Sequence, residues 1–142
     1  MKIVIINGPN LNLLGKREPD VYGTASFDDF YHSLVTQYPA VDFEYFQSNI
    51  EGELINELQR VGFTATGIIF NPGGYTHTSV AIGDTVAAIT TPVIEVHISN
   101  VHAREDFRKI SHVTAKSVGS IVGLGLKGYA LATEWFVANA NK

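Results

Sequence analysis

The fold class follows from residues 3–9, which read Ile-Val-Ile-Ile-Asn-Gly-Pro. A short, continuous run of β-branched residues is typical of a strand that is buried on both faces, and Asn, Gly and Pro end such a run. Strands of this kind occur in parallel sheets that carry helices on each side. Residues 3–6 therefore predict the first strand of an α/β fold.

Strand and helix patterns alternate along the rest of the chain. A helix is expected to begin at Ser26, where Asp29 completes a variant of the capping box, and to stop at Pro39. A second helix carries apolar residues from Leu54 onward and ends at Gly62, which stands where a left-handed C-cap belongs. The other expected strands are Val41–Phe46, Ile68–Phe70, Val93–Ile98 and Ser120–Val122, and the other expected helices are Ser79–Ala88, His102–Ile110 and Leu126–Ala138.

Length and composition predict a single domain, residues 1–142, since the chain has enough apolar material for one core. The alternation predicts helices on both faces of a five-stranded parallel sheet. We expect a flavodoxin-like three-layer sandwich with strand order 2-1-3-4-5. In such sheets ligands bind beyond the carboxyl ends of the strands, where the order reverses. The polar residues that follow the expected strands would meet at this rim: Asn7, Asn10, Asn12, Gln47, Ser48, Asn49, Asn71 to His77, His97, Ser99 and Asn100.

Composition excludes several classes of function. The chain has a formal charge of −4 and ten scattered Lys and Arg residues, so no basic stripe is available for nucleic acid. Its lack of cysteine excludes disulfides and thiolate chemistry. The apolar run after Met1 is too short for a signal peptide, and no later run could span a bilayer. We therefore expect a cytoplasmic protein without a membrane partner.

The most informative strand reads Val-Ile-Glu-Val-His-Ile-Ser over residues 93–99. The two-residue period of a strand places Glu95, His97 and Ser99 on one face. Burying a carboxylate is costly unless it is paired, and a contact between Glu95 and His97 would offset part of that cost. Such a contact would also orient the imidazole for general acid catalysis. The alternative is a purely structural pair at the end of the sheet.

A polar segment bracketed by Gly15 and Gly23 follows the first strand. It can form either a mobile lid over a site or an ordinary surface loop. A phenol has an ordinary pKa of about 10, so Tyr22 could act as a base near neutral pH only if a cation favoured its phenolate. Arg17 could supply that charge. The alternative for Tyr22 is a packing role with a solvated hydroxyl.

Residues 71–79 read Asn-Pro-Gly-Gly-Tyr-Thr-His-Thr-Ser and lead from the third strand into a helix. The glycines let the backbone approach a ligand closely, and amides at a helix start can bind an anion. A turn followed by an N-cap explains the glycines, Thr78 and Ser79 equally well. A turn with an N-cap gives no reason why Asn71 and His77 should both occur in this segment.

Two patterns that resemble cofactor sites are set aside. Residues 123–128 match the dinucleotide motif G-x-G-x-x-G, but no strand with an acidic residue follows about 20 positions later. The five histidines show no spacing typical of metal ligands: they are His32, His77, His97, His102 and His112. We expect neither a metal nor a cofactor.

Together these segments resemble the type II 3-dehydroquinate dehydratases along essentially the whole chain. The matching motifs are residues 7–15, Arg17-Glu-Pro19, Tyr22-Gly23, Gln47-Ser-Asn49, Glu51-Gly52, residues 71–79 and residues 95–105. The resemblance implies dehydration of 3-dehydroquinate to 3-dehydroshikimate by an anti elimination through an enolate. The pathway would be the shikimate pathway of aromatic amino acid biosynthesis or the breakdown of quinate.

The resemblance also implies a role for individual residues. Tyr22, as a phenolate beside Arg17, would remove the proton next to the ketone, and Asn12 would hold a water against the enolate oxygen. His97, oriented by Glu95, would protonate the leaving hydroxyl. The implied substrate contacts are His77 and Arg108 at ring hydroxyls, Ile98 and Ser99 at the carboxylate, Asn71, and Asp84 in the site of a neighbouring subunit.

The family assembles as trimers grouped into dodecamers, so the resemblance implies a homododecamer. The chain departs from the usual family pattern at five residues: Ile50 in place of His, Gly83 in place of Arg, Lys109 and Ile110 in place of two His, and His112 in place of Tyr. None of these is implied to transfer a proton. They bear on contacts between subunits around Asp84.

Two rival functions place a ligand or partner at the same rim. A non-catalytic flavodoxin-like module would bind a nucleotide or a flavin there, but the chain has no phosphate loop. An interaction domain that resembles a response-regulator receiver would need acidic residues after the first strand and a phosphoryl-accepting Asp after the third. Asn7 and Asn71 stand at these positions.

Overall fold

The computed structural model describes residues 1–16, 20 and 26–142. Within these residues the five strands are β1 (Lys2–Asn7), β2 (Asp42–Gln47), β3 (Gly67–Asn71), β4 (Val93–His97) and β5 (Gly119–Val122). Neighbouring strands pair in parallel in the order β2-β1-β3-β4-β5. The predicted fold class and strand order are confirmed.

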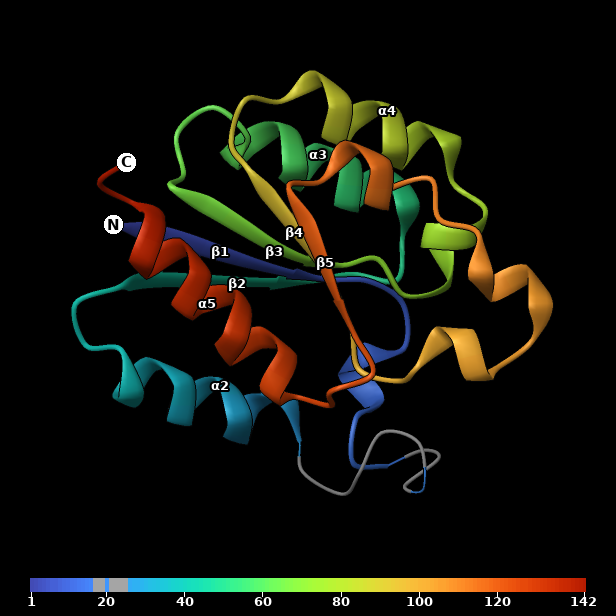
Figure 1. The fold of residues 1–142 in the computed structure, drawn as a ribbon, viewed down its shortest axis with the longest axis horizontal. Helices are drawn as coiled ribbons and strands as arrows, with labels where there is room; N and C mark the ends of the chain where they lie inside the picture. The colour runs from blue at the N-terminus through green and yellow to red at the C-terminus, as the bar shows by residue number, and fades with distance from the viewer. Residues whose placement is uncertain (17–19, 21–25) are drawn as a thin grey trace.

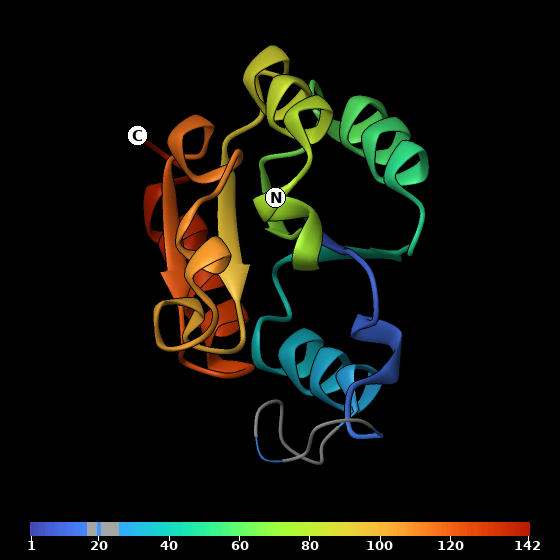
Figure 2. The ribbon, with the colours of Figure 1, turned by 90° about the vertical axis from the view of Figure 1, so that its right-hand side faces the viewer.

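Helices cover both faces of the sheet. The helices α2 (Phe27–Gln37) and α5 (Lys127–Asn139) lie on one face, and α3 (Glu51–Val61) and α4 (Val80–Ala88) lie on the other (Figure 1). The turned view shows the same three layers (Figure 2). In the described part of the chain, no helix is both long and apolar enough to cross a membrane.

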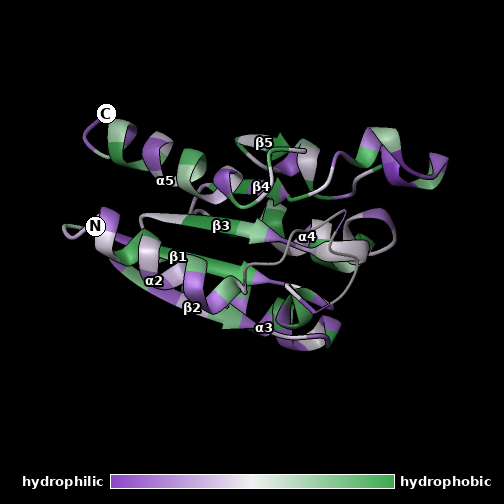
Figure 3. Ribbon diagram, turned by 90° about the horizontal axis from the view of Figure 1, so that it is seen from below, coloured by the Kyte–Doolittle hydropathy of each residue, from purple (hydrophilic) through white to green (hydrophobic). Residues whose placement is uncertain are grey.

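The central strands are buried because their side chains alternate between two hydrophobic cores. Ile3 and Ile5 of β1 pack toward α2 and α5, whereas Val4 and Ile6 pack toward α3 and α4. Figure 3 shows the apolar strands β1 and β3 enclosed between the helices. A strand with a core on each side needs apolar residues at every position, which explains the continuous run in the sequence.

The predicted helix starts are present as side-chain caps. The Oγ atom of Ser26 accepts a hydrogen bond from the backbone N–H of Asp29 at 3.1 Å, which fixes the first turn of α2. The Oγ atom of Ser79 accepts from the backbone N–H of Ile82 at 3.0 Å at the start of α4. Both residues therefore direct the chain from the rim of the sheet into a helix.

Gly62 follows α3, but the prediction of a left-handed cap is wrong. Its φ of −68° and ψ of −3° are right-handed helical values. A Cβ atom at this position would overlap the side chain of Ile89 and the main-chain oxygen of Leu58. Glycine is therefore needed here for close packing rather than for a positive φ.

The prediction of a helix over His102–Ile110 is also wrong. Two short 3₁₀ turns, η3 (Val101–Ala103) and η4 (Asp106–Lys109), replace it, and Arg104 and Glu105 between them are extended. A short helix has little intrinsic stability in water. The backbone is instead fixed by the side-chain cap of Asn100 on η3 and by two hydrogen bonds: the N–H of His112 donates to Thr76, and the carbonyl oxygen of Ile110 accepts from His77.

Candidate active site

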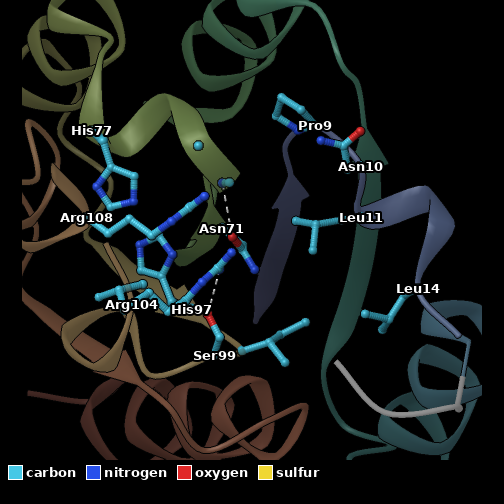
Figure 4. Close-up of a pocket in the computed structure, with 14 residues that line it drawn as sticks. Pro9, Asn10, Leu11, Leu14, Asn71, His77, His97, Ser99, Arg104 and Arg108 are labelled. Carbon is cyan, nitrogen blue, oxygen red and sulfur yellow. Dashed lines mark hydrogen bonds between the residues drawn. The ribbon is translucent and has the colours of Figure 1, made fainter. Parts of the chain in front are cut away.

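A cavity of about 140 Å³ lies at the carboxyl ends of β1, β3 and β4. Its position between β1 and β3 is the point where the strand order reverses, as the sequence predicted. In Figure 4 the segment after β1 forms one wall, and histidine and arginine side chains form the opposite wall. The lining residues are Pro9, Asn10, Leu11, Leu14, Asn71, Gly73, Gly74, His77, His97, Ile98, Ser99, Val101, Arg104 and Arg108.

Glu95 and His97 form a buried pair on β4. The Nε2 atom of His97 lies 2.6 Å from Oε1 of Glu95, and the two residues are 8% and 0% exposed, respectively. A carboxylate oxygen only accepts hydrogen bonds, so Nε2 carries a hydrogen and donates it. Nδ1 is therefore the ring nitrogen that remains for a ligand in the cavity. The expected contact is present, and it places a proton carrier in the cavity wall.

Three hydroxyls, which we call the hydroxyl cluster, surround the same carboxylate: Thr76, Ser111 and Thr114. The two threonines donate hydrogen bonds to Glu95, and the Oγ atom of Ser111 lies 3.2 and 3.3 Å from its two carboxylate oxygens. Burial raises the pKa of Glu95. The hydrogen bond and charge of His97, together with the hydrogen bonds of Thr114 and Thr76, lower that pKa by more than burial raises it. The pKa lies below its ordinary value, so Glu95 is ionised at neutral pH.

His77 lies beside His97 in the cavity wall. The ring centroids are 6.3 Å apart, and the Nδ1 atom of His77 donates to the carbonyl oxygen of Ile110 at 2.7 Å. Burial lowers the pKa of His77, and the nearby His97 and Arg108 lower it further. The hydrogen bond to Ile110 raises this pKa, but by less, so it stays below its ordinary value. A neutral His77 offers Nε2 as an acceptor to a ligand hydroxyl. Among the described residues, no cluster of histidine and carboxylate side chains could hold a metal ion.

Two arginines bring positive charge to the cavity. The Nε atom of Arg108 donates to Glu105 at 2.6 Å, and its guanidinium carbon lies 4.9 Å from the ring centroid of Phe107. The Nη1 atom of Arg104 donates to Oγ of Ser99 at 3.2 Å. Because both guanidinium groups line the cavity, the arrangement can hold an anionic ligand such as a carboxylate.

The side chain of Asn71 is held by a hydrogen bond to Tyr129 of α5. Asn7 and Asn71 are register partners at the ends of β1 and β3. The hydroxyl of Tyr129 donates to Oδ1 of Asn7 at 2.8 Å and accepts from Nδ2 of Asn71 at 2.9 Å. Burial raises the pKa of Tyr129, so this hydroxyl keeps its proton. Asn71 retains one amide hydrogen for a ligand in the cavity.

The Tyr129→Phe variant is expected to lose about 1–3 kcal/mol of unfolding free energy, because two buried amide groups lose their partner. Urea unfolding would measure the loss. Tyr31→Phe is the matched control, since the hydroxyl of Tyr31 makes a part-buried hydrogen bond of 3.3 Å to the carbonyl oxygen of Phe43. Equal unfolding midpoints for the two variants would contradict the bridging role of Tyr129.

The residues expected at the substrate carboxylate line this cavity, and Asn12, expected at the enolate, is the sequence neighbour of a lining residue. Ile98 and Ser99 line it directly after β4. Asn12 lies on the 3₁₀ turn η1 (Leu11–Leu13), whose residue Leu11 lines the cavity. The Oδ1 atom of Asn12 is 3.5 Å from Nε2 of Gln47, so this amide is at the exposed edge of the site.

Asp84 is a predicted site residue that lies away from this cavity, and two further predicted residues fall outside the described part of the chain. Asp84 is exposed on α4 and is not among the lining residues. Tyr22 and Arg17 lie outside the described residues. The cavity therefore brings together the residues expected to bind substrate and to act as the acid.

Several residues of the site were missed from the sequence. Thr76 and Arg104 lie within the matched motifs, but their residue types gave no separate signal. Ser111 and Thr114 come from a segment without a recognisable motif. Tyr129 appeared as one more aromatic residue of the last helix. No pattern in the sequence showed that these side chains converge on Glu95 and on the paired asparagines.

Comparisons with known proteins show which family this chain resembles. The model of the family described as dehydroquinase class II matches residues 1–137. A 3-dehydroquinate dehydratase of Fusobacterium nucleatum is 50% identical over 148 aligned positions, which cover 100% of both chains. One from an Exiguobacterium species is 53% identical and covers 93% of this chain and 91% of its own. The crystal structure of a type II dehydroquinase from Butyrivibrio crossotus superposes with a TM-score of 0.92 at 44% identity, covering 96% of this chain and 97% of its own.

Proposed function

The chain belongs to the dehydroquinase class II family, hydro-lyases that dehydrate 3-dehydroquinate, and we propose that it forms 3-dehydroshikimate by an anti elimination through an enolate. The observation that carries this mechanism is the pair of His97 and buried Glu95 in the wall of a cavity that also holds two arginines. An elimination of water needs a base, a group that stabilises the enolate oxygen, and an acid.

The first step is removal of the proton on the carbon next to the ketone. Tyr22 accepts this proton as a phenolate, and the charge of Arg17 favours that ionised form. The electron pair of the broken C–H bond forms the enolate. Asn12 holds a water that donates a hydrogen bond to the enolate oxygen. The exposed position of Asn12 beside the cavity supports this assignment.

The second step is loss of the hydroxyl group. The enolate returns to a ketone, its electron pair forms the new carbon–carbon double bond, and the C–O bond to the hydroxyl breaks. His97 gives its Nδ1 proton to the leaving oxygen, which departs as water. Glu95 holds Nε2 of His97, so the transferable proton is on the nitrogen that remains for a cavity ligand. A return of the proton from Tyr22 to His97 through solvent completes the cycle.

Substrate is held by groups at the ends of β3 and β4 and in the segments that follow them. His77 accepts a hydrogen bond from a ring hydroxyl through Nε2, Arg108 donates to a second hydroxyl, and Asn71 donates its remaining amide hydrogen. The Ile98–Ser99 segment binds the substrate carboxylate. The guanidinium of Arg104, which bonds to Ser99, adds positive charge at this end.

Asp84 is proposed to act in a neighbouring subunit, since it is exposed and does not line the cavity of its own chain. This role requires a homo-oligomer, which we propose to be a dodecamer built from trimers. We propose that the single catalytic domain works in the cytoplasm, in the shikimate pathway or in quinate breakdown, as the family resemblance implies.

The purified protein, treated with a chelator, is expected to convert 3-dehydroquinate at the same rate as untreated protein. No step above uses a metal ion or a cofactor. The conjugated product absorbs in the ultraviolet, so the reaction can be followed directly. A chelator-dependent loss that an added metal restores would contradict the mechanism. A flat trace from folded, oligomeric protein would favour a binding module instead.

A further inference from the structure

The segment of residues 110–114 binds His77 directly and reaches His97 through Glu95. The main-chain oxygen of Ile110 accepts from Nδ1 of His77 at 2.7 Å. The hydroxyls of Ser111 and Thr114 contact the carboxylate of Glu95, which binds His97. This segment lies outside the motifs that carry the family resemblance, yet it reaches the group proposed to act as the acid.

The hydroxyl hydrogen of Ser111 can go to Glu95 or to a hydroxyl that itself donates to Glu95. Its oxygen accepts hydrogen bonds from the backbone N–H groups of Val113 and Thr114, each at 3.0 Å, which uses both lone pairs. Its hydrogen must then go to Glu95 or to the Oγ1 atom of Thr76, 2.7 Å away. Thr76 donates its own hydrogen to Glu95. Both routes therefore end at the carboxylate.

Every hydrogen-bond partner of Glu95 in the described residues is a donor. Oε1 receives hydrogen bonds from His97 and Thr76, and Oε2 receives one from Thr114, while Ser111 lies near both oxygens. A proton on this carboxyl group would need an acceptor, which none of these groups offers without breaking its present hydrogen bond. The arrangement fits a carboxylate in one fixed orientation.

Among the described residues, His97 is the titratable group that bonds directly to Glu95, and His112 lies on the segment of residues 110–114 itself. His97 lies on the same strand, and His77 and Arg108 come from η2 (Gly73–His77) and η4. The residues in register with Glu95 on β3 and β5 are Phe70 and Ser120, which do not titrate. Neutral hydroxyls therefore set the orientation of Glu95, and within the described residues His97 is its only direct ionisable partner.

Gly83 of α4 lets residues 110–114 approach this closely. A Cβ atom at position 83 would overlap the main-chain oxygen of His112 and lie 3.3 Å from the Cβ atom of His112. The backbone of His112 cannot easily move away, because its N–H donates to the carbonyl oxygen of Thr76 at 2.8 Å. The glycine on α4 and the position of the hydroxyl cluster are therefore linked.

We propose that Ser111 and Thr114 are positioning residues for the acid step: they fix the orientation of Glu95 and through it that of His97, and Gly83 admits the segment that carries them. This inference rests on the proposed role of His97 as the general acid. Neither hydroxyl touches the substrate in this arrangement, since neither lines the cavity. Their effect is therefore expected on kcat rather than on KM.

The test uses the full-length enzyme with 3-dehydroquinate as substrate. Ser111→Ala and Thr114→Val are each expected to lower kcat roughly ten- to a hundredfold, since small misplacements of catalytic groups cost this much. KM should stay within about twofold. The acidic limb of the kcat profile should move to higher pH, because loss of a donor raises the pKa of Glu95. Ser111→Thr, which keeps a hydroxyl, should restore most of the rate.

Two further variants complete the test. Gly83→Ala is expected to show the same shift of the acidic limb, because it displaces His112 and the adjacent Ser111. Ser117→Ala is the matched control: its hydroxyl donates to the carbonyl oxygen of Val113 at 3.0 Å and has no contact with Glu95. It should keep the profile of the original chain.

Each outcome separates the positioning role from the proposed acid. Unchanged kcat and pH profile in folded Thr114→Val and Ser111→Ala, with His97→Ala inactive, would overturn the positioning role alone. Full activity of His97→Ala would instead overturn the acid assignment. If Ser111→Ala does not fold, Thr114→Val decides the question, because valine keeps the shape of the side chain and removes only the hydroxyl.

Discussion

Replacing His97 by alanine is expected to lower kcat by roughly 10²–10⁴-fold, the usual contribution of a positioned general acid. The imidazole is the proposed proton donor to the leaving hydroxyl, and the cavity wall offers Nδ1 for that transfer because Glu95 binds Nε2. The variant also removes one donor from a buried carboxylate, so a stability loss of about 1–3 kcal/mol is expected. Steady-state kinetics well below the unfolding midpoint would measure the change in kcat.

Proton exchange would show which step His97 serves. If the enolate forms before the hydroxyl leaves, His97→Ala should still exchange the proton next to the ketone with deuterium from solvent, as followed by NMR. His32→Ala is the matched control, since His32 is exposed on α2. A full rate of dehydration in His97→Ala would point to water or another donor as the acid.

The fold was predictable because each strand and helix carries its own local pattern. The run of residues 3–6 indicated a strand with a core on each side, and Ser26 and Ser79 marked helix starts that the structure confirms. The errors lie where packing overrides local preference. At Gly62 the glycine serves contact with Ile89, a residue distant in sequence, and not a turn.

The site was predictable only in part, for a similar reason. Parallel strands bring their carboxyl ends to one rim, so Asn71 and His97 could be expected at the same cavity. A two-residue period also shows which face of β4 Glu95 occupies, but not what lies opposite. The partners of Glu95 at positions 111 and 114 depend on the path of an irregular segment. That path is fixed by hydrogen bonds that the segment forms with residues 76 and 77.

The fixed hydrogen bonds give the two histidines different chemical roles. His97 donates Nε2–H to the carboxylate of Glu95, whereas His77 donates Nδ1–H to the neutral carbonyl of Ile110. Burial keeps the pKa of His77 below its ordinary value. One histidine is therefore suited to give a proton and the other to accept a hydrogen bond from substrate, although their rings are only 6.3 Å apart.

Replacing Tyr22 by phenylalanine is expected to lower kcat by roughly 10²–10⁴-fold, because phenylalanine has no group that can accept the proton next to the ketone. The change removes one oxygen atom and keeps the ring, so folding should stay intact. Ultraviolet absorbance of the conjugated product would measure turnover. Tyr75→Phe is the matched control, since Tyr75 donates its hydroxyl to the carbonyl oxygen of Asn49 at 3.0 Å and does not line the cavity.

Tyr22→Phe and His97→Ala are expected to differ in proton exchange, although both lose turnover. The base variant should show no exchange of the proton next to the ketone, because it cannot form the enolate. The acid variant should still show it, because the enolate forms and returns. If Tyr22→Phe exchanged this proton at the rate of the original chain, another group would have to be the base. Loss of exchange in both variants would instead mean that proton removal and departure of the hydroxyl occur in one concerted step, in which neither residue can act without the other.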